Sequence, residues 1–519
     1  MRLQEKKARL GPFFFESGNM VYPSRAEFER LSRENNLIPL YSEILADLDT
    51  PVSAFLKLDD GNYSYLLESV ERGEKLGRYS FIGIDPFLVF QSMSRKASVF
   101  YPTGKSEEYE IDKDPLDFLK QIMRRFRVVS LPQLPIFFGG AVGYVGYDVI
   151  RFWEKIPHVG KEDLNLPECF FILTKNVIIF DHLDHKIKLV GYAFLNGESP
   201  AKIYQQTAER IEKIIYKLSR RLPQISQTRV CPQNKSQKEK VLSNFTPQEF
   251  EGCVREAKEF IKAGDIFQVV LSQRFSRKID VSPFEIYRVL RSLNPSPYMY
   301  YLKCGDFSLV GSSPEILVRK EGKRVVLRPI AGTRPRGKSD QEDTKLASSL
   351  LNDEKEKAEH IMLVDLGRND LGRVCQYGTV KVKELFSLER YSHVIHLVSE
   401  VEGMLRKEVD QFDLLRACFP AGTVSGAPKV RAMQIIEELE PSKRGPYAGA
   451  LGYFSFSGNM DTCIIIRTVI VSGDTAYIQA GAGIVADSIP EREFEETQNK
   501  AKALIRAIEI AEEKKEWFW

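Results

Sequence analysis

Pairs of short apolar runs joined by tight turns are the sequence feature that most restricts the fold of this chain. One pair covers residues 315–320 and 324–330, and another covers residues 463–471 and 475–480, each around a glycine. Two strands joined by so short a turn run antiparallel. Such hairpins outnumber strand–helix–strand units. We therefore predict an α+β fold with largely antiparallel β-sheets in a sandwich-like core and helices packed outside.

The first part of the chain combines further apolar runs with two amphipathic segments. The segments 115–126 and 201–218 have helical periodicity. Turn-forming residues separate the apolar runs, which therefore predict strands. The predicted strands are residues 52–58, 63–67, 79–84, 171–181 and 186–192.

A polar segment without periodicity, residues 231–240, separates this part from the rest. We therefore expect an N-terminal domain over residues 1–229, a linker over 230–245 and a second domain over 246–519.

Helix start motifs mark the second part. Thr246 and Glu249 form a capping box around a proline, and a similar start lies at Ser282. Periodicity also predicts long helices over 343–366 and 429–439.

Charge and cysteine content exclude several classes of protein. The net charge is only +3, so nothing in it calls for a nucleic-acid partner or an anionic membrane. The 7 cysteines are scattered without a paired CxxC motif, which fits a reducing compartment. No apolar run is long enough to span a bilayer, so we expect a cytoplasmic chain without a membrane partner.

A glycine-rich segment near the C-terminus is the first candidate for a ligand site. Residues 479–484 have strand character, and we expect the strand to break at Gly481 and Gly483, where a missing Cβ lets a ligand approach the backbone. A helix is predicted from Pro490, with Ser488 and Glu491 as its capping box.

Two helices each present a pair of carboxylates. Glu493, Glu496 and Lys500 share one face of the C-terminal helix, and Glu356 and Glu359 share a face of another. Carboxylates from two helices could hold Mg²⁺ beside an anionic substrate. The alternative is that each face is a solvated row of salt bridges.

Other polar residues lie where an anion could bind. Thr333 and Thr423 follow glycine turns, Arg467 interrupts an apolar strand, and Tyr447 lies in a glycine-rich segment. Each also has a structural alternative, namely a tight turn, an ion pair or core packing. His396 is the best candidate for a general acid or base among 6 histidines, although taken alone such a residue is by default a core histidine.

Taken together, eight segments resemble the chorismate-utilising enzymes, and most closely their anthranilate synthase large-subunit branch. The resemblance covers nearly the whole chain. The segments are Gly264-Asp-Ile-Phe-Gln-Val-Val270, Gly311-Ser-Ser-Pro-Glu315, Pro329-Ile-Ala-Gly-Thr-Arg334, Lys355-Glu-Lys-Ala-Glu-His360, Val364-Asp-Leu-Gly-Arg-Asn-Asp370, His396-Leu-Val-Ser399, Pro420-Ala-Gly-Thr-Val-Ser-Gly-Ala-Pro-Lys429 and Gln479-Ala-Gly-Ala-Gly483.

The resemblance implies a two-step reaction, the first committed step of tryptophan biosynthesis. Ammonia attacks C2 of chorismate while the C4 hydroxyl leaves; pyruvate is then eliminated and the ring becomes anthranilate. Glu315 matches the family's general acid, and Glu359 and Glu496 match its Mg²⁺ ligands, with Glu356 and Glu493 in support. Gln268, His396 and Thr423 would complete the catalytic set. The implied substrate-binding residues are Thr333, Thr423, Tyr447, Arg467, Ala482, Gly483 and Lys500.

Two positions discriminate among branches of the family. Relatives that add water have a lysine base where this chain has Gln268, and relatives that aminate C4 have a nucleophilic lysine where Ala331 stands. Both departures favour ammonia at C2. No glutaminase segment follows Asn499, so the resemblance implies a separate glutamine amidotransferase subunit as partner.

Three alternatives remain open at this point. The chain could stop at aminodeoxyisochorismate, it could be an aminodeoxychorismate synthase component, or it could be a catalytically silent tryptophan-sensing relative. His396 favours completion of the reaction, and no site carboxylate has been lost.

A regulatory site is also implied by the resemblance. Glu68 and Ser69, followed by Ser80, resemble half of the family's tryptophan-inhibitor motif, and we expect Glu68 to pair with the ligand ammonium. The N-terminal domain would then be regulatory. The other half of the motif is Asn294, Pro295, Pro297, Tyr298 and Met299.

Overall fold

The chain folds into antiparallel strands that are covered by helices. The structure is a computed structural model that describes residues 21–69, 77–222, 240–390 and 394–513. The helices are α2 (Arg25–Leu31), α3 (Pro51–Leu58), α4 (Pro115–Arg124), η2 (Tyr147–Phe152), α5 (Pro200–Leu218), α6 (Pro247–Lys262), α7 (Pro283–Leu293), α8 (Asp340–Leu351), α9 (Glu354–Gly372), α10 (Gln411–Cys418), η3 (Gly422–Val424), α11 (Lys429–Leu439) and α12 (Pro490–Glu512).

The strands belong to one hydrogen-bonded network, and the pairings between them are antiparallel, as the hairpin pattern predicts. The strands are β1 (Leu37–Leu45), β2 (Tyr63–Glu68), β3 (Tyr79–Met93), β4 (Lys96–Phe100), β5 (Ser106–Glu110), β6 (Gly140–Val145), β7 (Cys169–Asp181), β8 (Lys186–Phe194), β9 (Leu242–Ser243), β10 (Gln268–Lys278), β11 (Tyr298–Cys304), β12 (Phe307–Ser313), β13 (Ile316–Glu321), β14 (Arg324–Leu327), β15 (Ile330–Pro335), β16 (Lys381–Arg390), β17 (Val394–Met404), β18 (Gly426–Ala427), β19 (Ala450–Ser455), β20 (Met460–Ile464), β21 (Thr468–Ser472) and β22 (Thr475–Ile484).

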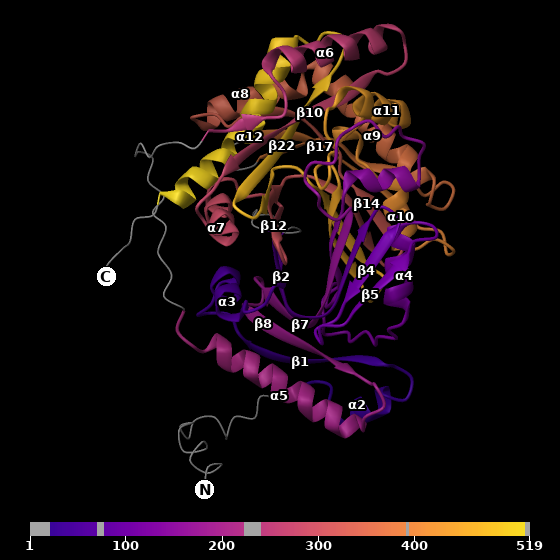
Figure 1. Cartoon of the computed structure of the whole chain (residues 1–519), viewed down its shortest axis with the longest axis vertical. Helices are drawn as coiled ribbons and strands as arrows, with labels where there is room; N and C mark the ends of the chain where they lie inside the picture. Colours follow the sequence, from indigo (N-terminus) through magenta and orange to yellow (C-terminus); the bar gives the residue numbers. More distant parts are fainter. Residues whose placement is uncertain (1–20, 70–76, 223–239, 391–393, 514–519) are drawn as a thin grey trace.

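Strand packs on strand in the interior, and helices cover the outer faces. One buried cluster comes almost wholly from strands of both parts of the chain and includes Tyr144, Ile172 and Leu309. Two other clusters join strand faces to helices, one through α3, α5, α7 and α12 and the other through α4, α9 and α10. In Figure 1 the N-terminal helices α2, α3 and α5 lie at one end, and α6, α8, α9, α11 and α12 lie at the other.

The two parts of the chain share strands across the predicted domain division. β2 pairs with β11 and β6 pairs with β19, each over six residues. Residues 230–239 of the predicted linker lie outside the described residues. Its remaining part, 240–245, contains β9, which pairs with β10. The division into residues 1–229 and 246–519 stays a prediction.

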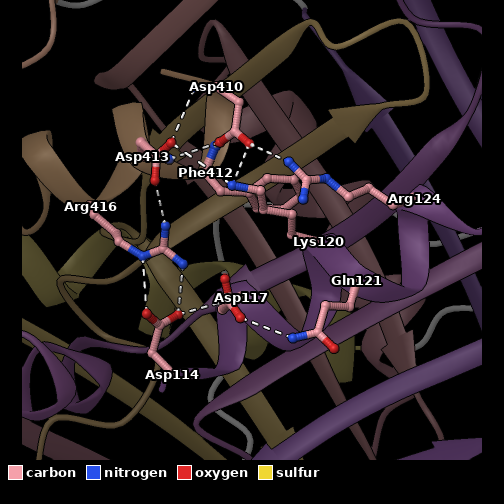
Figure 2. Close-up of polar contacts among 9 residues, drawn as sticks. All are labelled: Asp114, Asp117, Lys120, Gln121, Arg124, Asp410, Phe412, Asp413 and Arg416. Atoms are coloured by element: carbon pink, nitrogen blue, oxygen red, sulfur yellow. Dashed lines mark hydrogen bonds and ion pairs between the residues drawn. The ribbon is translucent and has the colours of Figure 1, made fainter. Parts of the chain in front are cut away.

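Helices α4 and α10 connect the two parts of the chain through ion pairs, in which the N-terminal carboxylate of each helix meets a cation of the other (Figure 2). Asp114 caps α4 and accepts two hydrogen bonds from the Arg416 guanidinium of α10, at 2.9 and 3.1 Å. Asp410 caps α10 and pairs with Lys120 of α4 at 2.7 Å. Each cap is therefore paired with a cation from the other helix. α10 leads into η3, which contains Thr423.

Two predicted elements are wrong because a local cap overrides the apolar pattern. Residues 52–58 form helix α3, since Thr50 and Ser53 make a capping box around Pro51. The predicted helix 343–366 is two helices, because Asp353 accepts from the backbone amides of Lys355 and Glu356 and starts α9 anew.

The C-terminal segments differ from expectation in three details. The predicted strand 463–471 is interrupted at Arg467, whose φ of +52° is left-handed. β22 continues through Gly481 and Gly483 instead of breaking there. α12 starts at Pro490 without a side-chain cap, because the Ser488 hydroxyl accepts from the Val485 amide instead.

In the part of the chain that the structure describes, no helix combines the length and apolar character needed to cross a membrane.

Candidate active site

Strand β10 is the frame on which the candidate site is built. At its N-terminal end it pairs with β18 on one side, where Gln268 lies opposite Ala427, and with β22 on the other, where Val270 lies opposite Gly483. The glycine-rich strand and the turn before α11 are thereby brought to the same end of β10. Segments more than 200 residues apart in sequence become neighbours there.

The two glycines of β22 leave room for side chains that cross the strand. A Cβ on Gly481 would lie 2.8 Å from the Tyr447 hydroxyl oxygen, and a Cβ on Gly483 would lie 2.6 Å from Gln268 Nε2. Real Cβ atoms do not approach so closely. At Gly481 the Leu271 carbonyl oxygen also lies 2.9 Å away, so that position requires glycine, whereas at Gly483 the Gln268 side chain would have to move. The side chain of Ala482 is buried among residues of α6 and α11, so only its backbone can contact a ligand.

Carboxylates and an ammonium group from α9 and α12 meet at this end of β10. Gln268 Nε2 donates to Glu359 Oε1 at 3.2 Å. Lys500 Nζ lies 2.7 Å from Glu496 Oε1 and donates to the Gly481 carbonyl at 2.9 Å. The predicted shared face of α12 is therefore present and points to the glycine-rich strand.

The acidic groups raise one another's proton affinity. Burial raises the pKa of Glu359, and the nearby carboxylates Glu356 and Glu496 raise it further. Burial and Glu496 likewise raise the pKa of Glu493. Glu356 itself accepts from Arg334 at 2.9 Å. Arg334 and Lys500 thus each pair with one carboxylate, Glu356 and Glu496, while Glu359 and Glu493 have no ion pair in the described chain.

This charge pattern fits a divalent cation. Over residues 21–69, 77–222, 240–390 and 394–513, no three His, Cys, Asp or Glu side chains come close enough together to hold a metal ion on their own. Mg²⁺ is commonly bound by one or two protein carboxylates together with substrate oxygens and water. Glu359 and Glu496 could supply such a pair.

Arg467 faces the same centre. Its Nη1 donates to the Lys500 carbonyl at 2.7 Å, and its own carbonyl accepts from the Ser312 amide at 3.0 Å. Within the described residues it forms no ion pair, and burial lowers its pKa although Tyr447 and Glu496 oppose that shift. A half-buried guanidinium without a paired carboxylate is suited to an anionic substrate group.

Glu315 is the most strongly perturbed carboxyl group of the site. It lies between β12 and β13 and is 8% exposed. Burial raises its pKa to about 8, while the neighbouring Thr423 hydroxyl and the Lys500 ammonium oppose the increase. At neutral pH it is therefore mainly protonated and able to donate a proton. Glu315 lines a cavity of about 40 Å³ together with residues of α9 and η3.

His396 and Thr333 pair across β17 and β15. His396 Nδ1 lies 3.0 Å from the Thr333 hydroxyl oxygen and 3.2 Å from the Gly332 carbonyl oxygen. Burial lowers the pKa of His396. The ring is therefore mainly neutral at pH 7, and the carbonyl contact favours the tautomer with the proton on Nδ1.

A second, larger cavity of about 300 Å³ lies where the predicted inhibitor motif comes together. Ser69 from the end of β2 and the segment from Pro297 to Met299 line it. The Ser69 hydroxyl oxygen is buried and makes no hydrogen bond within the described chain. Aromatic rings line part of the remaining wall, namely Tyr79, Phe81, Phe137 and Tyr453, and charged side chains, among them Glu68 and Arg319, line another part.

Other residues of that motif have structural partners. The Glu68 carboxylate accepts from Tyr287 Oη at 2.5 Å and from Arg291 Nε and Nη2 at 2.9 and 3.1 Å. This carboxylate is paired with a cation of α7 and also lines the cavity, and its pairing with a ligand ammonium stays a prediction. Ser80 is likewise engaged, with His182 Nε2 at 2.7 Å.

Asn294 and Pro295 lie outside the lining of this cavity. The Asn294 side chain instead donates to the Ser312 hydroxyl at 3.1 Å, at the end of α7. It therefore anchors the bend that leads into Pro297.

Sequence reasoning missed residues that only the pairing of distant strands brings to these sites. Phe137 and Tyr453 stack in the larger cavity with ring centroids 4.1 Å apart, although they are more than 300 residues apart in sequence. Arg444, beside Tyr447, is fully buried under the catalytic site. Its position directly before the glycine-rich segment around Tyr447 could have drawn attention to it.

Comparisons with known proteins cover most of this chain. A family model described as chorismate binding enzyme matches residues 63–506. Anthranilate synthase component 1 of Acetivibrio thermocellus and that of Aquifex aeolicus are each 50% identical over 495 residues, covering 95% of this chain and 100% and 99% of their own lengths. The crystal structure of anthranilate synthase component I from Streptococcus pneumoniae gives a TM-score of 0.75 at 38% identity, covering 89% of this chain and 99% of that one.

Proposed function

We infer the function of this chain from its family, because it belongs to the chorismate-binding enzymes and is a homologue of anthranilate synthase component 1. It is an enzyme of tryptophan biosynthesis that converts chorismate and ammonia to anthranilate and pyruvate. The observation that best supports this chemistry is the buried Glu315, which holds a proton at neutral pH beside the cluster of Gln268, Glu359 and Lys500.

The residues divide into binding and proton-transfer roles. Arg467, Tyr447 and Lys500 would hold the substrate carboxylates, since each places a cation or hydroxyl at the glycine-rich strand. Glu315 would give its proton to the departing C4 hydroxyl, which would otherwise leave as hydroxide. Ammonia adds at C2 in the same step.

The second step removes pyruvate and restores an aromatic ring. It needs a base for the hydrogen at C2, and the neutral His396 is the candidate. Its contact with the Gly332 carbonyl holds the ring in one orientation.

Glu359 and Glu496, supported by Glu493, would hold Mg²⁺. When bound, the cation would neutralise these carboxylates and attract the substrate carboxylate to them. Glu356 supports the site less directly, because it is paired with Arg334.

The choice of ammonia over water follows from Gln268. Water must be deprotonated before it attacks, whereas ammonia is already a nucleophile. The Gln268 amide cannot act as a base, and its Nε2 is committed to Glu359.

The purified chain is expected to form anthranilate from chorismate, Mg²⁺ and an ammonium salt, but not from glutamine. A partner glutamine amidotransferase, which the component 1 name of the relatives implies, would supply ammonia from glutamine. The measurement is anthranilate fluorescence with each nitrogen source. Glutamine-driven turnover by the rigorously purified chain would contradict the need for a partner, and accumulation of aminodeoxyisochorismate would show a reaction that stops early.

We also propose that tryptophan inhibits this enzyme from the larger cavity. The cavity has the volume of a small-ligand pocket, aromatic walls for an indole and an unpartnered buried hydroxyl at Ser69. Ser69 directly follows β2, whereas the catalytic residues belong to other elements, among them β10, β17, α9, η3 and α12. Inhibition then requires tryptophan to prefer an inactive arrangement, and chorismate should in turn weaken tryptophan binding.

Replacing Ser69 with leucine is expected to weaken inhibition by tryptophan at least about tenfold, because a lost hydrogen bond and a filled cavity together cost more than about 1.4 kcal/mol. Inhibition is measured relative to each variant's own uninhibited rate, and binding is measured by calorimetry. Ser98→Leu on β4, outside the cavity, is the control. Undiminished tryptophan binding by Ser69→Leu would place the inhibitor elsewhere.

A further inference from the structure

One fully buried arginine contacts several parts of the candidate active site. Arg444 is 2% exposed, and its guanidinium pairs with Glu440 at 2.6 Å. Its Nη1 donates to the Val424 carbonyl at 2.6 Å, and its Nη2 donates to the Val270 carbonyl at 2.7 Å. Val424 follows Thr423 directly, and Val270 is two residues after Gln268.

The same guanidinium also lies between two tyrosine rings. Its central carbon is 4.8 Å from the ring centroid of Tyr147 and 5.5 Å from that of Tyr447. Both distances are typical of a cation over an aromatic face. One side chain therefore contacts the turn before α11, the start of β10 and the ring of Tyr447.

The partner carboxylate extends the network into β10. Glu440 Oε1 accepts from the backbone amide of Ser272 at 2.8 Å and from its hydroxyl at 2.9 Å. The Ser272 hydroxyl in turn accepts from Gln479 Nε2 at 2.9 Å, on β22. The ion pair thus also fixes how the glycine-rich strand lies against β10.

Stability alone does not account for such a pair. Removing two charges from water costs about as much as their attraction returns, so buried ion pairs are weak contributors to the free energy of unfolding. A planar guanidinium instead fixes the directions of its hydrogen bonds, since its N–H donors are rigid relative to one another. A lysine cannot reach both carbonyls and the carboxylate with the same geometry.

We propose that Arg444 is a positioning residue that holds the Thr423 turn, the Gln268 end of β10 and the Tyr447 ring in their mutual arrangement for the reaction. Its guanidinium is engaged by Glu440 and by the Val424 and Val270 carbonyls, so it is not available to bind substrate directly. It acts through Thr423 beside Glu315, and through Tyr447 at the substrate carboxylate. This role rests on the proposed function of the same site.

The decisive variant replaces both charges, Arg444→Met together with Glu440→Met. Exchanging a buried ion pair for apolar residues of similar volume generally preserves the fold. If the pair positions the site, kcat falls about 100-fold, since a displacement of about 1 Å is enough for such a loss. The alkaline limb of the pH profile should also move to higher pH, because Thr423 would no longer oppose the raised pKa of Glu315.

Arg444→Lys is the second variant, since it keeps a cation beside Glu440 but not the fork. We expect a folded enzyme with kcat reduced at least about tenfold and the alkaline limb displaced in the same direction. The matched control is the double variant Arg277→Met and Glu512→Met, which removes a partly buried ion pair from the opposite end of β10. It lies about 30 Å along the strand from Gln268 and should keep the wild-type profile.

The wild-type chain in the same assay tests the proposed function separately. If that function is wrong, the wild type itself forms no anthranilate, whereas a wrong positioning role affects only the interpretation of the variants. Wild-type kcat and an unmoved alkaline limb in either folded Arg444 variant would overturn the positioning role. Failure of both variants to fold, judged by circular dichroism, would overturn it as well, since Arg444 would then be a structural residue.

Discussion

Glutamine in place of Glu359 or Glu496 is expected to reduce turnover of chorismate by roughly 1,000-fold while the chain stays folded. The reason is the charge of the acidic cluster, in which burial and the neighbouring carboxylates raise the pKa of Glu359. A neutral amide is a poor ligand for Mg²⁺. Loss of a bound cation removes several kcal/mol of electrostatic stabilisation, which corresponds to a rate factor of this size.

The measurement is the steady-state rate with ammonia at several Mg²⁺ concentrations. Glu495→Gln is the matched control, because Glu495 is exposed and adjacent to Glu496 on α12. It should keep nearly full activity. EDTA is expected to abolish turnover of the wild-type chain, and undiminished turnover in EDTA would remove the metal from the mechanism.

Elements with their own local start or stop motif could be predicted from the sequence. The helix after Thr246 begins as expected, because Thr246 and Glu249 satisfy each other's backbone groups over a distance of three residues. The hairpin of β13 and β14 likewise depends on a turn inside the segment. The shared face of Glu496 and Lys500 follows from helical periodicity alone, and their contact at 2.7 Å confirms it.

Features that depend on distant partners could not be predicted in the same way. Arg467 was expected inside a strand, yet the hydrogen bond of its carbonyl to Ser312 accompanies a left-handed backbone that no local pattern indicates. The pairing of Glu68 with Arg291 joins residues 223 positions apart. Such contacts follow from which strands become neighbours, and strand order is set by packing of the whole chain.

The candidate site combines both kinds of information. Spacing on each helix identifies its carboxylates, but only β10 brings α9, β22 and the Thr423 turn to one end of the sheet. The glycines of β22 show the difference clearly. Their sequence predicts that a ligand approaches the backbone closely, whereas the structure shows that the side chains of Tyr447 and Gln268 themselves occupy that space.

Turnover is expected to fall as the pH rises through about 8, because Glu315 must carry a proton to serve as the general acid. Burial holds the pKa of this carboxyl at about 8. Free ammonia increases over the same range, so the two effects oppose each other. Rates should therefore be compared at equal concentrations of free ammonia, where the fall due to Glu315 remains.

Glu315→Gln is expected to reduce kcat by about 100- to 10,000-fold, the usual contribution of general acid catalysis, and to remove the alkaline limb. Its stability should not fall. In the wild type the folded state keeps the proton up to about pH 8, whereas the unfolded chain releases it near pH 4.5, so this residue lowers the free energy of unfolding as pH rises between these values. Glutamine does not titrate, so the variant should become the more stable protein toward pH 8.

Thr423→Val provides the complementary measurement. The Thr423 hydroxyl lowers the pKa of Glu315, so its loss should move the alkaline limb to higher pH. An alkaline limb that persists in Glu315→Gln would assign the acid to another residue.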